Sequence, residues 1–175
     1  VITMLDVCIT MVSTKEKAEI EKSLASLYAD NINSGVNFSV VIVDNNSGED
    51  PESLKEKFAN LMIISQEKNR GFGASHNRAF AAAEARYYFI LNPDTEFPAG
   101  GNFLRKMTDF MDANPHIGLA GPKINYPDGA IQYSCYRFPG LLQPLFSRTG
   151  LGQTATGQKI TDRYSSEVMM VMRLS

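Results

Sequence analysis

The chain of 175 residues is 43% hydrophobic and 21% charged, which is typical of a globular domain and too apolar for a disordered protein. Its 17 basic and 19 acidic side chains give a net charge of −2, and this balance argues against a dedicated nucleic-acid-binding protein. We find no apolar run long enough to span a membrane, no secretory signal at the start, and no C-x-x-C pattern around Cys8 or Cys135. We therefore expect a cytoplasmic protein with reduced thiols.

Basic residues are concentrated in the last third of the chain. Residues 121–175 carry six basic and three acidic side chains, a net charge of +3, so the rest of the chain is acidic. Such a segment is compatible with peripheral contact to anionic lipid at the inner face of a membrane, or with a diphosphate ligand. An ordinary solvated surface explains the same charges more simply.

Apolar runs alternate with amphipathic stretches along the first two-thirds of the chain. Short, nearly continuous apolar runs predict strands over residues 7–12, 38–43, 61–64, 87–91 and 117–120. Helical spacing, with Ser13 or Thr14 and then Asp50-Pro51 as start signals, predicts helices over residues 15–28, 51–58, 74–85 and 102–114. Strands alternating with helices predict an α/β fold with a mainly parallel sheet flanked by helices.

The pattern weakens toward the C-terminal end. Pro127-Asp128-Gly129 predicts a tight turn between two strands of a hairpin. Residues 139–163 contain several glycines and little periodicity, which predicts a long irregular loop. Residues 168–172 are apolar enough to form one more strand.

Three polar clusters, residues 44–47, 69–73 and 92–94, directly follow predicted strands. The carboxyl ends of parallel strands share one edge of a sheet, and ligands bind beyond that edge in open α/β folds. The clusters therefore predict a polar crevice that contains two carboxylates, Asp44 and Asp94. Asp44 can accept hydrogen bonds from a nucleoside base or from ribose hydroxyls, although an aspartate at this place is also a good turn residue.

Asp94 is the strongest candidate for a metal ligand. It follows an apolar strand and the rigid Asn92-Pro93 step. A carboxylate there can hold Mg²⁺ or Mn²⁺ while a diphosphate occupies other positions around the metal. In an extended segment Asn92 and Asp94 point the same way, whereas the alternative is a capping turn.

Gly71-Phe72-Gly73 opens the helix predicted after the third strand. Glycine allows a ligand to approach the backbone, and a helix N-terminus favours phosphate, although an ordinary strand-to-helix turn has the same composition. The spacing matches neither G-x-G-x-x-G, because position 76 is His76, nor a Walker A loop, so a nicotinamide dehydrogenase is disfavoured. His76 could reach a phosphate, but we expect a polar surface histidine.

Taken in order, these clusters resemble family 2 glycosyltransferases, most closely the bacterial rhamnosyltransferase-like members. The resemblance covers about residues 5–140. Each motif is weak alone, but several in order at strand ends are specific together. The segments that carry the resemblance are residues 7–12, 41–47, 69–77, 91–94, 121–123, 128–134 and 137–139.

The resemblance implies a GT-A fold, with a Rossmann-like sheet that binds a nucleoside-diphosphate sugar over residues 1–138. An irregular loop and the incomplete start of an acceptor-side region would follow over residues 139–175. Asp94, with Asn92 in the first position of a D-x-D-type motif, would bind a divalent metal, Mg²⁺ or Mn²⁺. The other residues that the resemblance assigns to nucleotide-sugar binding are Ser13, Asp44, Asn46, Asn69, Gly73 and Asn77.

The resemblance also implies an inverting enzyme that transfers a sugar to a growing cell-surface polysaccharide or a lipid-linked acceptor. Thymidine-diphosphate rhamnose is the donor that the subgroup suggests. The family's catalytic base, an acidic residue of an E-D-type motif, corresponds to a position beyond residue 175, so we assign no catalytic residue. One alternative stays open, a catalytically incomplete nucleotide-sugar-binding or assembly module. A nucleotidyltransferase with a related sheet is disfavoured, because it needs a glycine- and arginine-rich loop after the first strand and Ser13-Thr14-Lys15-Glu16 is not such a loop.

Overall fold

The computed structural model describes residues 4–132 and 172–173, and the chain forms two compact units, Val1–Phe110 and Met111–Ser175. Cys135, the predicted boundary at residue 138, the predicted loop over residues 139–163 and most of the predicted strand over residues 168–172 lie outside the described residues. No helix in the described part of the chain is long and apolar enough to cross a membrane.

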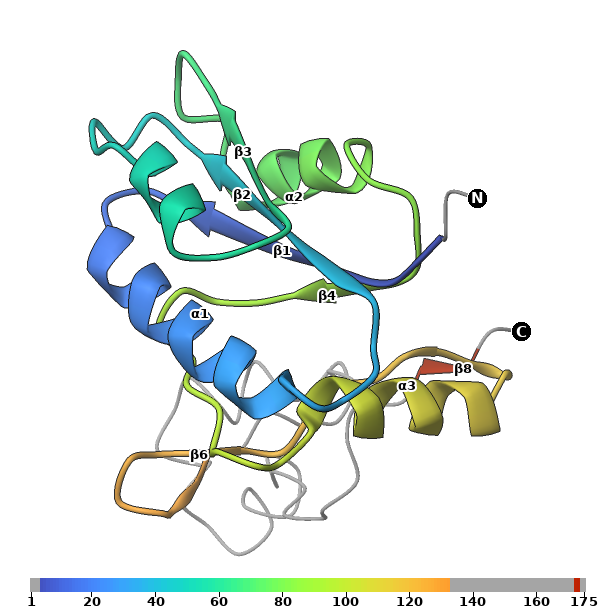
Figure 1. Cartoon of the computed structure of the whole chain (residues 1–175). Coiled ribbons are helices and arrows are strands. Elements are labelled where there is room, and N and C mark those ends of the chain that lie inside the picture. Colours follow the sequence, from blue (N-terminus) through green and yellow to red (C-terminus); the bar gives the residue numbers. More distant parts are fainter. Residues whose placement is uncertain (1–3, 133–171, 174–175) are drawn as a thin grey trace, which may run out of the picture. The chain divides into compact units, whose positions relative to one another are not determined.

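The first unit is built on a four-stranded parallel sheet (Figure 1). Its strands are β1 (Leu5–Ser13), β2 (Phe38–Asp44), β3 (Leu61–Ser65) and β4 (Ala85–Ile90), in the order β3-β2-β1-β4. The register pairs Ser13 with Asp44, and Asp44 with Ser65, so three strands end level with one another. This arrangement confirms the predicted α/β class and parallel sheet.

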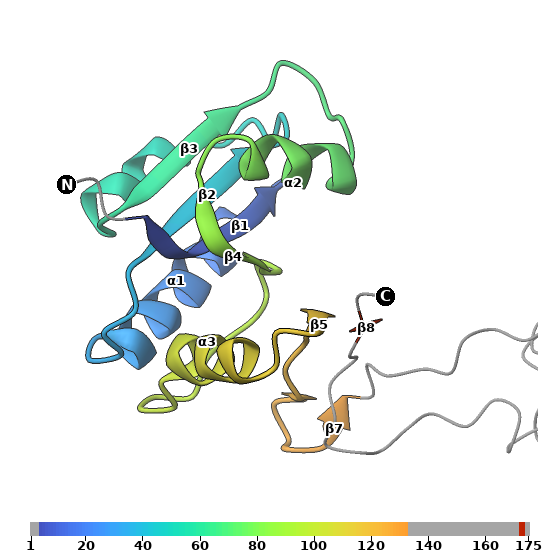
Figure 2. The same cartoon turned by 90° about the vertical axis from the view of Figure 1, so that its right-hand side faces the viewer.

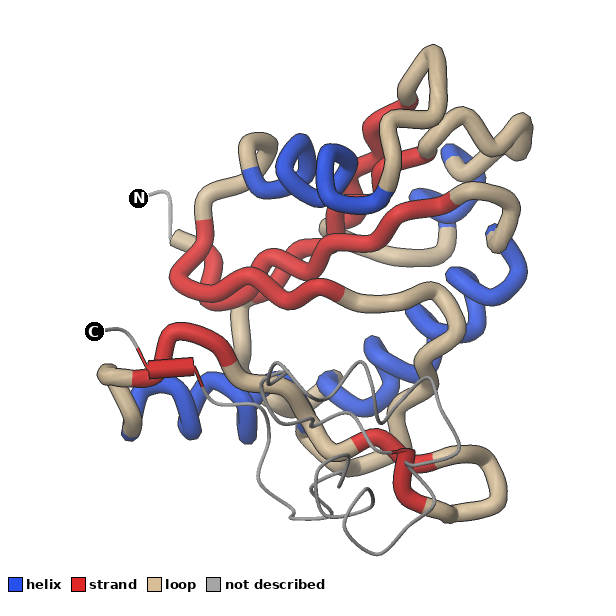
Figure 3. Tube along the Cα trace, turned by 180° about the vertical axis from the view of Figure 1, so that it is seen from behind, coloured by secondary structure: helices blue, strands red, loops and turns tan. Residues whose placement is uncertain are grey.

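Helices cover both faces of this sheet (Figures 2 and 3). On one face lie α1 (Lys17–Asn31) and the short 3-10 helix η1 (Glu52–Glu56), and on the other lies α2 (Phe72–Phe80). Because both faces are covered, β1 and β2 are buried along most of their length, as their continuous apolar sequences predict. The edge strand β4 alternates between half-buried and exposed positions.

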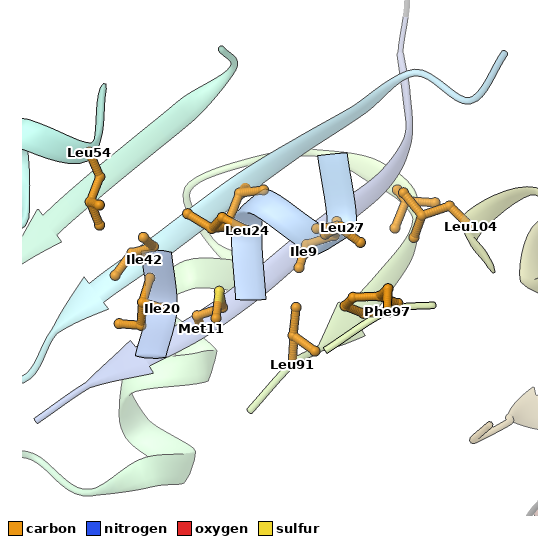
Figure 4. Close-up of a cluster of buried hydrophobic side chains, with 12 residues drawn as sticks. Ile9, Met11, Ile20, Leu24, Leu27, Ile42, Leu54, Leu91, Phe97 and Leu104 are labelled. Carbon is orange, nitrogen blue, oxygen red and sulfur yellow. The ribbon is translucent and has the colours of Figure 1, made fainter. Parts of the chain in front are cut away.

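The larger core lies between the sheet and α1 (Figure 4). Side chains two residues apart point to the same face of a strand. Alternate residues of β1 and β2 therefore enter this core, and the residues between them enter a smaller core on the opposite face of the sheet. Burying each aliphatic side chain contributes about 1.5–3 kcal/mol. The fully buried members from the sheet and α1 are Ile9, Met11, Ile20, Leu24, Leu27, Val40 and Ile42.

The smaller core lies between the sheet and α2, and it contains Cys8, Val41, Val43 and Ala79. Cys8 is a free thiol without any exposed surface. Burial raises its pKa, so the thiol stays protonated and unreactive at neutral pH.

Two predicted helices differ from the observed ones. In place of a helix over residues 51–58, the chain forms only η1, because it must turn into β3 at Leu61, and Asn60 makes this turn with a φ of 54°. The helix predicted over residues 74–85 begins at Phe72 and ends at Phe80. The alanines that follow have high helix propensity, but they form the connection into β4.

Helix α3 (Phe103–Ala113) begins against the C-terminal end of α1. The carboxylate of Asp30, which is 2% exposed, accepts hydrogen bonds from the backbone N–H groups of Asn102 (2.9 Å) and Phe103 (2.7 Å). The Asn31 side-chain oxygen accepts another from Leu104 N (3.0 Å). Two side chains of one helix therefore cap the first turn of another.

The second unit contains two small antiparallel pairs among its described residues. Strand β5 (Ile117–Leu119) pairs with β8 (Met172–Arg173), and β6 (Ile124–Asn125) pairs with β7 (Ile131–Gln132). The turn between β6 and β7 contains Gly129 with a φ of 85° and a hydrogen bond from Ala130 N to the Asp128 carboxylate (2.9 Å). The predicted hairpin is confirmed.

Candidate functional site

The three predicted polar clusters leave the sheet at one edge. Strands β1, β2, β3 and β4 all run in the same direction, and the loops that follow them start beside one another at the carboxyl edge. After β4, Leu91 N donates to Thr10 O (3.0 Å) and carries the chain along β1. Strands β2 and β4 therefore flank β1, about 10 Å apart across two strand spacings, and the loops that hold Asp44 and Asp94 continue from them at this edge.

Asp44 lies at the last position of β2 and is 8% exposed. Its Oδ1 accepts a hydrogen bond from Ser47 N (3.0 Å), which is the turn interaction that the sequence suggested as an alternative. This bond uses one of the two carboxylate oxygens. The turn and a ligand contact through the other oxygen are therefore compatible.

Asn45 follows Asp44 and joins the loops after β2 and β3. Its backbone N–H donates to Ser13 O (2.8 Å), which continues the sheet by one bond. Its side-chain Nδ2 donates to Asn69 Oδ1 (2.9 Å), and its Oδ1 accepts from Arg70 N (2.8 Å). No local signal in the sequence singles out Asn45, because its partners lie 24 and 25 residues further along the chain.

The loop after β3 leads into α2 through Gly71, which has a φ of 81° and a ψ of 169°. This conformation is essentially restricted to glycine. No side chain of the described residues caps the helix, so its first N–H groups are left for other partners. A Cβ built on Gly73 would meet nothing within 4 Å. The space beside Gly73 is therefore open, and a ligand could approach the first turn from this side.

Asn92, Pro93 and Asp94 form a turn, in which Thr95 N donates to Asn92 O (3.3 Å). The extended conformation that would point Asn92 and Asp94 the same way is therefore not present, because the proline and the polar residues favour a reversal here. Both side chains are exposed. The backbone of residues 92–95 therefore forms the turn that the sequence offered as the alternative to an extended segment, and the Asp94 carboxylate is accessible on this turn.

The remaining predicted site residues differ in accessibility. Ser13 is buried at the end of β1, where its carbonyl accepts the bond from Asn45. Asn46 is exposed and has a φ of 62°, typical of an asparagine in a left-handed turn. Asn69 is at the edge, and its Oδ1 also accepts from Gly71 N (2.8 Å). Asn77 is exposed one helical turn beyond Gly73, about 6 Å along α2.

His76 is not the polar surface residue that the sequence suggested. It is 2% exposed, and its Nδ1 shares a hydrogen bond of 2.8 Å with Thr10 Oγ1 beneath α2. The ring also packs edge-on against Phe72 at 4.3 Å between centroids. Positions 75, 76 and 79 form the buried stripe of α2, so helical periodicity is the signal that could have identified His76 as buried.

Burial lowers the pKa of His76 below its usual value of about 6.5. The unfolded chain keeps the usual pKa of His76, and the folded chain has the lowered one. Between these two pKa values the unfolded chain binds a proton that the folded chain does not, so we expect the free energy of unfolding to fall as the pH decreases below about 6.5. His76→Gln removes the titrating group and should flatten this part of the profile, measured by urea unfolding at several pH values. His116→Gln, at an exposed histidine, is the control. Parallel profiles for wild type and His76→Gln would contradict the prediction.

The residues at this edge fit a metal that binds together with a diphosphate. The described residues contain no group of three or more His, Cys, Asp or Glu side chains that could hold an ion. Asp94 supplies one exposed carboxylate, and Asn92 supplies an exposed amide on the same turn. Mg²⁺ is commonly held by one or two carboxylates with substrate phosphates and waters. A single acidic ligand therefore suits a shared site and not a cage closed by protein alone.

Solved structures with a similar fold include S. aureus TarS 1-349, with a TM-score of 0.55 and 19% identity over 69% of this chain and 42% of that chain. The same protein in complex with UDP-GlcNAc has a TM-score of 0.55 and 18% identity over 71% of this chain and 42% of that chain. The mannosyltransferase PcManGT from Pyrobaculum calidifontis, in complex with GDP-Man and Mn²⁺, has a TM-score of 0.59 and 21% identity over 73% of this chain and 37% of that chain. The chain thus spans less than half the length of these structures, and its fold is the predicted GT-A fold.

Sequence comparison gives the family. No curated protein matches the chain by sequence. The model of the family described as glycosyl transferase family 2 matches residues 8–173, which is nearly the whole chain. The match includes most of β1, all of β2 to β4 and every residue predicted for nucleotide-sugar binding. The chain therefore belongs to glycosyl transferase family 2.

Proposed function

We propose that this chain binds a nucleoside-diphosphate sugar with a divalent metal at the carboxyl edge of its sheet, as the donor-binding part of an inverting glycosyltransferase. The observation that carries the proposal is the convergence of Asp44, the uncapped start of α2 and the Asp94 turn at that edge. The similar structures that contain UDP-GlcNAc, or GDP-Man with Mn²⁺, support the same ligand class.

Each part of the edge offers one kind of contact. Asp44 accepts hydrogen bonds from the base or ribose through its second carboxylate oxygen. The first turn of α2 donates backbone N–H groups to the diphosphate, and its positive dipole end favours the negative charge. Asp94 holds Mg²⁺ or Mn²⁺, which when bound neutralises charge that develops on the leaving diphosphate.

The acceptor in this proposal is a saccharide or a lipid-linked saccharide, and the product is a cell-surface polysaccharide. An acceptor hydroxyl attacks the anomeric carbon in line as the nucleoside diphosphate leaves, and a base takes the hydroxyl proton. We assign no such base among residues 4–132. Thymidine-diphosphate rhamnose is the first donor to test, because the resemblance to rhamnosyltransferase-like members suggests it.

Calorimetric titration tests the proposal directly. UDP, GDP and dTDP are titrated into the chain with Mn²⁺ and again with EDTA. We expect at least one of them to bind with Mn²⁺ and to bind much more weakly without it. If none binds under either condition, the proposal is wrong. Binding without any sugar transfer to saccharide acceptors would favour the binding-module alternative.

Gly73→Ala provides a local test of where the diphosphate lies. The added methyl group meets no protein atom, and alanine is favoured over glycine in helices by up to about 1 kcal/mol, so thermal stability should be unchanged or slightly higher. Nucleotide affinity should fall about tenfold, because the methyl group occupies the space proposed for the ligand. Gly121→Ala is the matched control, since its Cβ also meets nothing within 4 Å. Equal affinity in both variants would place the ligand elsewhere.

A further inference from the structure

Asn45 is a buried amide that holds together two loops of the proposed donor site. It is 2% exposed, and both ends of its side chain are hydrogen bonded to the loop after β3. Nδ2 donates to Asn69 Oδ1 at 2.9 Å, and Oδ1 accepts from Arg70 N at 2.8 Å. We call this set of bonds, with the one from Gly71 N to Asn69 Oδ1, the amide clamp.

The amide clamp has a direction that its partners determine. Arg70 N–H can only donate, so the oxygen of Asn45 must face it. Asn69 Oδ1 accepts from Gly71 N–H as well as from Asn45, which uses both lone pairs of that oxygen. Position 45 therefore needs a donor and an acceptor at once, whereas position 69 needs only an acceptor.

A second buried contact holds the same loop at its other end. Gln66 N donates to Asp44 O (2.9 Å), and the Gln66 side chain donates to Ser75 Oγ (2.9 Å). Ser75 in turn donates to Gly71 O (2.8 Å). The loop is thus tied to the end of β2 and to α2, and Gly71 is bonded from both sides. These bonds hold the turn at Gly71 and the start of α2.

We propose that Asn45 is a positioning residue for the donor, because the amide clamp sets where Gly71 and the first turn of α2 lie relative to Asp44. This inference rests on the proposed function, since the clamp matters to a ligand only if the ligand binds between those parts. It also assigns the Asn69 side-chain oxygen to the clamp and not to ligand contact. The uncharged amide at position 45 is what the two opposite hydrogen bonds require.

Hydrogen exchange of the ligand-free chain tests the clamp without any nucleotide. Asn45→Ala should raise the exchange rates of the Arg70 and Gly71 amides at least tenfold. Asn69→Asp keeps an oxygen for both donors and should leave these rates close to wild type. Asn45→Asp keeps the acceptor for Arg70 N and loses the donor to Asn69, so it should raise the exchange rate of the Gly71 amide more than that of the Arg70 amide. If Asn45→Ala does not fold, Asn45→Asp takes its place in the test.

Calorimetry with nucleoside diphosphate and Mn²⁺ tests the functional consequence. Asn45→Ala should weaken binding at least tenfold at a temperature where it is fully folded. Asn31→Ala is the matched control: Asn31 is also buried, and its side chain donates to Leu27 O (2.9 Å) and accepts from Leu104 N (3.0 Å) at the C-terminal end of α1. It should lower the melting temperature and leave nucleotide affinity unchanged.

The outcomes separate this inference from the proposed function. If the wild-type chain binds no nucleoside diphosphate, the proposed function is wrong, and the positioning role of Asn45 is wrong with it. The exchange rates of Arg70 and Gly71 still show in that case whether the amide clamp exists. If the wild type binds and Asn45→Ala binds equally well, the positioning role is wrong and the proposed function stands. Unchanged Arg70 and Gly71 exchange in Asn45→Ala would also overturn it.

Discussion

Asp94→Asn is expected to reduce the Mn²⁺-dependent affinity for a nucleoside diphosphate about 100-fold, which corresponds to ~2.7 kcal/mol. The substitution keeps the size of the side chain and removes the acidic group on the turn that follows β4. A neutral amide is a poor replacement for a carboxylate that must offset the charge of a divalent ion. Calorimetry in the presence and absence of Mn²⁺ measures the effect.

A titration of Mn²⁺ alone belongs to the same experiment. Because the turn over residues 92–95 offers a single carboxylate, the metal should bind tightly only when a diphosphate supplies further ligands. Asp109→Asn is the matched control, since Asp109 is an exposed aspartate on α3 that pairs with Arg105 at 2.9 Å. If Asp94→Asn and Asp109→Asn retain equal affinity, Asp94 does not hold the metal.

Among the variants proposed here, Asp30→Ala is expected to lower the free energy of unfolding most, by about 3 kcal/mol. The buried carboxylate accepts two backbone N–H groups at the start of α3, and alanine would leave both without these bonds. For a chain of this size the melting temperature should fall by roughly 6–12 °C, measured by circular dichroism.

Two variants show whether this loss comes from the buried caps. Asp30→Asn keeps one acceptor oxygen and should lose about half as much stability. Asp50→Ala removes an exposed aspartate whose carboxylate accepts from Glu52 N (3.1 Å), and it should cost less than about 1 kcal/mol. Equal losses in Asp30→Ala and Asp50→Ala would show that burial does not determine the effect.

Local sequence patterns are sufficient to predict the strands, and they place the proposed site at one edge of the sheet. The nearly continuous apolar runs of β1 and β2 predict strands covered on both faces, because most positions of such a strand face one of two apolar cores. The polar residues that follow each run predict one functional edge, since parallel strands all end there. The order of these motifs along the chain, through their resemblance to family 2 glycosyltransferases, then indicates the class of ligand.

Helix boundaries are less predictable because chain connections override propensity. The alanines at positions 81–83 favour a helix by themselves, yet the chain must reach β4 at Ala85 and leaves the helix at Phe80. Similarly, the residues after Asp50 have good start signals, but the short distance to β3 leaves room only for η1. Local preference is worth roughly a few tenths of a kcal/mol per residue, less than the strand pairing that competes with it.

By itself, the sequence determined the α/β class, the strands and the family, because these follow from periodicity and from residues adjacent along the chain. It also predicts the edge at which a ligand should bind. Only the tertiary structure decided the strand order, the hydrogen bond between His76 and Thr10, and the hydrogen bonds of Asn45 to the loop after β3. The partners in these contacts are 24 to 66 residues apart. Such pairs become neighbours only when strands and helices pack, so no local pattern could show them.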